Sequence, residues 1–279
     1  MGWDIEDTLP VVGQEPETFL FSDKQIEELA KAKPLSSSKI CCLLYGKDGT
    51  GKSGIAFDYL TEEDIKAGYK LWIIDLDGGS IPLLTAYHSS KRDCITVIDP
   101  LELKHSKTGT EIDYLMTFAK VKAIVRYVRD HHIEQKIKGI VFDGLTTALD
   151  YAEQQMRLDK NIDVDGGVQL RYWLNRNKLF LETLEQIRCM PIAKFFIGHE
   201  NFIMKAGQNS AVIEKTNAMM IQKIRCVRND NLSDVKFNAI IDKSKYNISS
   251  EGANIEFGTV SKSSKEFNWN TDEIFKMLI

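Results

Sequence analysis

The chain has 279 residues, of which 43% are hydrophobic and 27% are charged, a balance typical of a globular protein with a sizeable core. Its 36 Lys and Arg against 40 Asp and Glu give a formal net charge of −4, which argues against coating nucleic acid by bulk charge but does not exclude a local basic groove. Short apolar runs, an acidic amino terminus and five cysteines without a Cys-x-x-Cys pair exclude membrane, secreted and disulfide-framework classes, so we expect a cytoplasmic protein.

The predicted elements begin after an acidic extension and linker at 1–38. Within 39–260, short apolar runs alternate with segments of helical period. The runs predict strands at 39–45, 70–75, 94–98, 138–143 and 193–198. The periodic segments predict helices over 52–60, 111–131 and 147–158, and a long helix that ends at 188. Apolar strands separated by helices are typical of a parallel sheet that is covered on both faces.

The pattern changes near residue 219, after which strands follow one another without helices. Runs at 219–228, 235–243 and 254–257 fit antiparallel additions to one edge of the sheet. Residues 261–279 are expected to form a tail with a short helix over 271–278. The expected fold is therefore an α/β core with antiparallel strands at its C-terminal edge.

The strongest motif follows the first predicted strand and matches Gly-x-x-x-x-Gly-Lys-Ser/Thr. Glycines let the backbone curl closely around a polyphosphate, so that N–H groups and the amino end of the next helix bind it. Lys52 is expected to bind the β- and γ-phosphates, and the Ser53 hydroxyl to ligate Mg²⁺. The predicted nucleotide-binding residues are Gly46, Lys47, Asp48, Gly49, Thr50, Gly51, Lys52 and Ser53.

Two other predicted strands end in carboxylates. Asp143 closes the strand at 138–143, in the form of a Walker B element, and is expected to hold Mg²⁺ or its water shell, with helix capping as the alternative. Asp75 and Asp77 alternate at the end of another strand, where ligands of open α/β sheets bind. Asp77 is the candidate for a general base or a residue that orients the attacking water, and an ordinary polar turn is the alternative.

Together these motifs resemble the RecA-like branch of P-loop ATPases over about 39–250, and they are similar to its compact single-domain members from phages and archaea. The resemblance implies a RecA-like P-loop NTPase core, with a mostly parallel twisted sheet flanked by helices. It also implies that the catalytic carboxylate follows the strand after the loop's helix. That position matches Asp77, although this chain has Asp where RecA itself has Glu.

Three further residues receive roles from the resemblance. His199 follows the strand at 193–198, where RecA-like proteins place a polar γ-phosphate sensor; the alternative is a surface turn residue. Lys243 and Lys245 resemble paired basic residues that reach into a neighbouring subunit's ATP site and neutralise charge on the departing phosphate. One solvated strand face explains the same spacing.

Residues 201–228 are the candidate DNA contact. The polar segment 201–218 is expected to be a long loop, and its Phe202 and Lys205 are the stacking group and phosphate partner that single-strand binders use. A basic strand face follows, formed by Lys223, Arg225 and Arg228. A solvated edge strand is the alternative, because Lys is common there as a guard against aggregation.

The sequence thus predicts an ATPase with ATP and Mg²⁺ as cofactors. We expect a homo-oligomer with ATP sites between subunits, which acts on single-stranded DNA in recombination, annealing or replication. A nucleotide or small-molecule kinase shares the phosphate loop, but such kinases usually carry an Arg-rich lid that the sequence lacks. An ATP-gated loader or assembly factor with low turnover is the third reading.

Overall fold

The structure, a computed structural model, describes residues 40–106, 109–163, 166–200, 210–264 and 267–278. These residues belong to one compact unit. The predicted extension at 1–38 and two predicted DNA contacts, Phe202 and Lys205, lie outside the described residues. No helix in the described part of the chain is long and apolar enough to cross a membrane.

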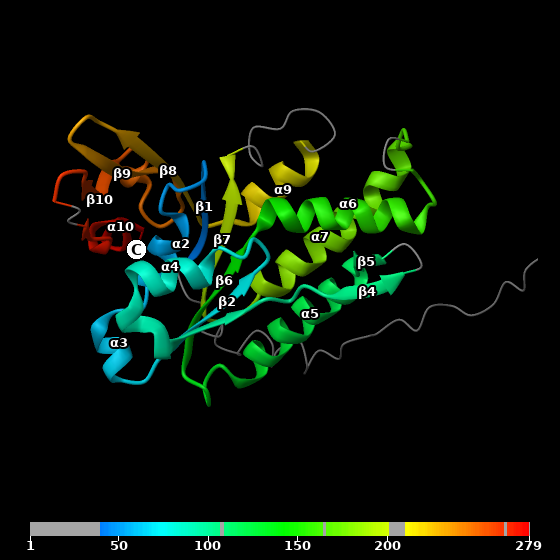
Figure 1. The fold of residues 1–279 in the computed structure, drawn as a ribbon, viewed down its shortest axis with the longest axis horizontal. Coiled ribbons are helices and arrows are strands. Elements are labelled where there is room, and N and C mark those ends of the chain that lie inside the picture. The colour runs from blue at the N-terminus through cyan, green and yellow to red at the C-terminus, as the bar shows by residue number, and fades with distance from the viewer. Residues whose placement is uncertain (1–39, 107–108, 164–165, 201–209, 265–266, 279) are drawn as a thin grey trace, which may run out of the picture. The chain divides into compact units, whose positions relative to one another are not determined.

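Among the described residues, nine strands form one sheet in the order β11-β10-β9-β8-β1-β7-β6-β2-β3 (Figure 1). Their bounds are β1 Cys41–Gly46, β2 Lys70–Asp75, β3 Ile95–Ile98, β6 Ile137–Asp143, β7 Ala193–His199, β8 Gln222–Asp230, β9 Asp234–Ser244, β10 Asn254–Ser261 and β11 Phe267–Trp269. The six strands from β8 to β3 in this order run parallel, whereas β9, β10 and β11 each pair antiparallel. The predicted α/β fold is therefore confirmed, including its antiparallel edge.

Helices cover both faces of this sheet. Successive side chains of each strand point to opposite faces, so the strands contribute to two core clusters. Cys41 and Leu43 of β1 pack in one core cluster, with helices α5, α6, α7 and α9, while Cys42 and Leu44 pack in the other, with α2, α4 and α10. The helix bounds are α2 Lys52–Asp58, α3 Glu62–Lys66, α4 Ser80–Tyr87, α5 Tyr114–His131, α6 Leu145–Asp159, α7 Trp173–Arg188, α9 Ser210–Met219 and α10 Asp272–Leu278.

The structure corrects two predicted elements. The loop expected at 201–218 is wrong for its second half, where α9 forms because Val212, Ile213 and Thr216 share one helix face and are buried. The helix expected from 111 begins at Tyr114 instead. A hairpin of β4 (Leu103–Ser106) and β5 (Gly109–Ile112) precedes it, and the side chain of Asp113 caps the helix.

The C-terminal residues are part of the same sheet and core. Strand β11 pairs with β10, with Gly258 opposite Trp269. Ile274 and Leu278 of α10 are fully buried in the cluster that contains α2. The end of the chain therefore packs against the helix that follows the glycine-rich loop.

Candidate nucleotide site

The glycine-rich loop joins the carboxyl end of β1 to the amino end of α2. Gly49 and Gly51 have φ of 67° and 83°, in the left-handed region that favours glycine. A Cβ atom at Gly46 would lie 2.2 Å from the carbonyl oxygen of Cys226, so β8 also requires a glycine there. The Thr50 hydroxyl donates to the carbonyl oxygen of Lys47 at 2.8 Å and closes the curl. The predicted motif therefore forms a tight loop at a helix amino end.

Lys52, the first residue of α2, lies beneath this loop. Its Nζ donates to the carbonyl oxygens of Gly46 at 3.1 Å and Lys47 at 2.7 Å. The side chain is 9% exposed, and this burial lowers the pKa of the ammonium group. The Lys52 ammonium group, which the motif supplies for binding phosphate, is thus held against the loop.

Asp143, the last residue of β6, lies against the first turn of α2. The Ser53 hydroxyl donates to its Oδ2 at 2.7 Å, and the Ser80 hydroxyl is 3.4 Å from the same oxygen. Burial raises the pKa of Asp143 to about 6 despite the hydrogen bond from Ser53, and the carboxylates of Asp75 and Asp77 act in the same direction as burial. A carboxylate and a hydroxyl therefore face each other where the motif predicted a cation site.

Asp75 shapes the turn after β2 rather than facing the loop. Its Oδ1 accepts from the backbone N–H groups of Asp77 at 3.2 Å and Gly78 at 2.8 Å, and its Oδ2 accepts from that of Ser80 at 2.9 Å. Strand β2 ends at Asp75, so the alternation that was expected to put Asp75 and Asp77 on one face stops there. The two carboxylates have different surroundings.

Asp77 follows β2, and its side chain contacts the first turn of α6 and the end of β7. Its Oδ1 accepts from the Thr147 hydroxyl, and its Oδ2 lies 3.4 Å from Nε2 of His199. The other ring nitrogen of His199, Nδ1, is 2.6 Å from Oδ1 of Asp48 in the loop, while its backbone N–H donates to the Thr146 hydroxyl. One imidazole therefore connects the loop to the candidate catalytic carboxylate.

The parallel register explains why these residues meet. Gly46 pairs with His199, Ile197 with Asp143, and Asp143 with Asp75. The carboxyl ends of four strands, β1, β7, β6 and β2, therefore lie side by side. Ligands of open α/β sheets bind at the carboxyl ends of the strands. Of the predicted site residues, the loop, Asp77, Asp143 and His199 come together here.

Lys243 and Lys245 lie elsewhere. Strand β9 runs antiparallel to β8, and Lys243, one residue before the end of β9, pairs with Lys223 near the beginning of β8. The Nζ atoms of Lys243 and Lys245 donate to the last turn of α9, at the carbonyl oxygens of Asn217 (2.7 Å) and Ala218 (3.4 Å). Both lysines thus lie near the amino ends of the parallel strands, whereas the loop of their own chain lies at the carboxyl ends.

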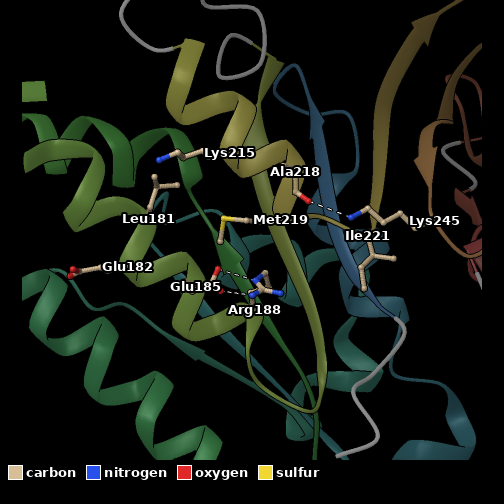
Figure 2. Close-up of a pocket in the computed structure, with 9 residues that line it drawn as sticks. All are labelled: Leu181, Glu182, Glu185, Arg188, Lys215, Ala218, Met219, Ile221 and Lys245. Atoms are coloured by element: carbon tan, nitrogen blue, oxygen red, sulfur yellow. Dashed lines mark hydrogen bonds and ion pairs between the residues drawn. The ribbon is translucent and has the colours of Figure 1, made fainter. Parts of the chain in front are cut away.

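Figure 2 shows Lys245 at one side of a groove of about 700 Å³ between α7, α9 and the beginning of β8. Met219 and Leu181 add apolar surface to this groove, and Glu185 pairs with Arg188 three residues further along α7. None of the residues that line it belongs to the glycine-rich loop. Its size is therefore no guide to the nucleotide site.

A second cavity, of about 530 Å³, lies beside the loop. Two residues of the predicted basic face, Arg225 and Arg228, contribute to it, whereas Lys223 lies over the ring of Tyr45. The guanidinium of Arg225 is 3.8 Å from Asp242. The cavity is lined by Lys47, Asp48, Thr50, Glu200, Arg225, Cys226, Val227, Arg228 and Asp230.

Sequence reasoning missed the threonines that hold the site together. Thr146 and Thr147 follow Asp143 after a single Gly-Leu pair and contact His199 and Asp77. The signal was a pair of adjacent hydroxyl residues at the start of a helix, directly after a strand that ends in Asp. Gly144, with φ of 108°, makes the turn between them.

Comparison with known proteins gives a distant likeness in structure alone. No family profile matches the chain, and no curated protein matches it in sequence. Among solved structures, a KaiC-like protein from the hyperthermophilic archaeon Pyrococcus horikoshii is similar, with 14% sequence identity and a TM-score of 0.45. The alignment covers 79% of this chain and 88% of the archaeal one.

Proposed function

We propose that the chain binds ATP with Mg²⁺ at residues 46–53 and hydrolyses it. The observation that carries this proposal is the meeting of Lys52, Ser53 and Asp143 at the mouth of one curled loop. A buried lysine at a helix amino end supplies positive charge for a polyphosphate. A hydroxyl and a strand-terminal carboxylate beside it complete the set that P-loop hydrolases use.

The donor set fits Mg²⁺. This cation prefers oxygen ligands and is usually held by one or two protein groups together with phosphate oxygens and water. The Ser53 hydroxyl and the Asp143 carboxylate are adjacent oxygen donors of that kind. When bound, the cation would neutralise charge on the phosphates.

Asp77 is the group best placed to orient a water molecule. Thr147 and His199 hold its two oxygens, so the carboxylate has a fixed direction near the loop. A base must be oriented as well as near its proton, and these contacts supply that orientation. His199 connects Asp77 to Asp48, which supports a role for its imidazole in sensing the occupant of the loop.

Two extensions of the proposal concern partners. Because Lys243 and Lys245 lie at the far edge of the sheet, a role at an ATP site requires a second copy of the chain, and we propose such a homo-oligomer. We also propose single-stranded DNA as the object acted on. The support is Arg225 and Arg228 beside the loop, where binding of a phosphate backbone could reach the ATP site.

The test measures release of phosphate from ATP by the full chain with Mg²⁺, in the presence and absence of single-stranded DNA. Hydrolysis that DNA stimulates, and that Lys52→Ala abolishes, supports the proposal. Phosphate transfer to an added nucleoside or nucleotide would favour the kinase alternative. Tight ATP binding with negligible turnover in every condition would favour the ATP-gated switch.

A further inference from the structure

The C-terminal strand β11 touches the glycine-rich loop through one side chain. Cβ atoms built on Gly51 and Gly54 would each lie 2.7 Å from the outer ring of Trp269, closer than real Cβ contacts allow. Gly51 also needs its glycine for the left-handed turn, but Gly54 lies inside α2 and outside the Gly-x-x-x-x-Gly-Lys-Ser/Thr pattern. Alanine is favoured over glycine in a helix, so packing against the indole is what requires Gly54.

The same indole is fixed to the far end of α2. Its Nε1 donates to the carboxylate of Asp58, the last residue of the helix. Asp58 also accepts from the Thr271 hydroxyl at 3.1 Å and from Nζ of Lys91 at 2.7 Å. His88 faces the same carboxylate, with Nδ1 at 3.4 Å. The ring is therefore held by a polar anchor while its edge presses on the beginning of the helix.

Aromatic neighbours hold Trp269 on its other sides. Phe257 meets the ring at 88° with a centroid distance of 4.8 Å, and Phe267 stacks on it at 5.3 Å. Gly258, opposite Trp269 in β10, leaves room for the ring, since a Cβ atom there would lie 2.7 Å from it. The indole thus has little freedom to move away from α2.

We propose that Trp269 is a positioning residue for the nucleotide site: it sets the position of α2, and with it the Lys52 ammonium and the Ser53 hydroxyl, relative to Asp143 on β6. The inference rests on the proposed function. Because Ser53 and Asp143 are 2.7 Å apart, a shift of α2 by a fraction of that distance separates the two cation donors. The chain's C-terminal strand therefore belongs to the machinery of the loop, although it is remote in sequence.

The test uses a pair of complementary substitutions in the full chain. Trp269→Leu removes the ring that defines the position of α2, and Gly54→Ala drives a methyl group into that ring. Each should weaken binding of Mg²⁺·ATP roughly ten- to a hundredfold, since loss of a group that orients the ligands of a cation typically costs this much in affinity or activity. The double variant Gly54→Ala/Trp269→Leu, in which the methyl group has room, should bind more tightly than Gly54→Ala alone.

Trp173→Leu is the matched control, because it removes an indole that packs on Arg176 of α7, away from the loop. Binding is measured by titration at a temperature well below the unfolding midpoint of every variant, which separates affinity from stability. Intrinsic tryptophan fluorescence should change on nucleotide binding in the wild type and in Trp173→Leu, and not in Trp269→Leu.

Affinity equal to wild type in Trp269→Leu would overturn the inference, as would a double variant that binds no better than Gly54→Ala. If Trp269→Leu does not fold, a comparison of Gly54→Ala with Gly54→Ala/Trp269→Phe decides the question in the same way. Failure of the proposed function itself is recognised separately, because the wild type and Lys52→Ala would then bind ATP alike.

Discussion

Replacing Asp143 with Asn should make the ligand-free protein more stable while it damages the nucleotide site. Burial, with the charges of Asp75 and Asp77 in the same direction, raises the pKa of Asp143 from the usual 3.8 to about 6. The folded state therefore resists ionisation of this group, and the stability present below pH 3.8 is lost as the pH rises through 6. Asn is neutral throughout and escapes the loss.

The size of the effect follows from the two pKa values. A difference of about two pKa units, at 1.36 kcal/mol each, gives the variant an advantage of about 3 kcal/mol at pH 8. At pH 5, where the folded wild type still holds the proton, the advantage falls to roughly half of that value. For a unit of this size, about 3 kcal/mol corresponds to a rise of roughly 6–12 °C in the unfolding midpoint.

The assay is thermal unfolding of wild type and Asp143→Asn at pH 5 and pH 8, without nucleotide and with a chelator. Asp93→Asn, at an exposed carboxylate, is the control and should change little. Added Mg²⁺ and ATP should raise the midpoint of the wild type far more than that of Asp143→Asn. A variant less stable than wild type at pH 8, or a difference that does not grow between pH 5 and pH 8, would refute the reasoning.

Three other changes test separate parts of the structure. Asp77→Asn should keep ATP binding and slow phosphate release at least tenfold, as loss of an oriented base does; an unchanged rate would place the base elsewhere. Asp58→Asn should lower the unfolding midpoint at pH 7. Burial opposes ionisation of Asp58, but the hydrogen bond from His88 and the charge of Lys91 outweigh it and lower the pKa of this carboxyl. The stability that ionised Asp58 contributes disappears as the pH falls below 3.8, so a destabilisation by Asn that persists there contradicts the account. Lys245→Ala should impair turnover only in assemblies, and mixing it with Asp77→Asn subunits should restore part of the activity if the lysine acts between chains.

Local sequence patterns were enough to predict the loop and the strands around it. The motif at 46–53 is flanked by an apolar run and a helical segment, which predict its strand and helix. The apolar run that ends in Asp143 predicts a strand from local sequence alone. The different roles of Asp75 and Asp77 could not be predicted, because they depend on where β2 ends. Alternation along an extended chain treated the two carboxylates as equivalent.

Features that depend on register and distant packing lay beyond sequence reasoning. The spacing of Lys243 and Lys245 fits a trans-acting pair, but only the pairing of β9 with β8 shows that they lie at the edge away from the loop. Helix α9 was missed because its polar composition hid the buried Val212. Trp269 gave no signal at all, since it meets Gly54 only after β11 joins the sheet.

The central claim is that the curled loop above Lys52 binds a polyphosphate. Calorimetric titration of ATP with Mg²⁺ into the wild-type chain and into Lys52→Ala tests it most directly. We predict saturable binding by the wild type that the substitution abolishes, with both proteins equally folded by circular dichroism. Equal affinities, or no heat of binding from a folded wild type, would contradict the account.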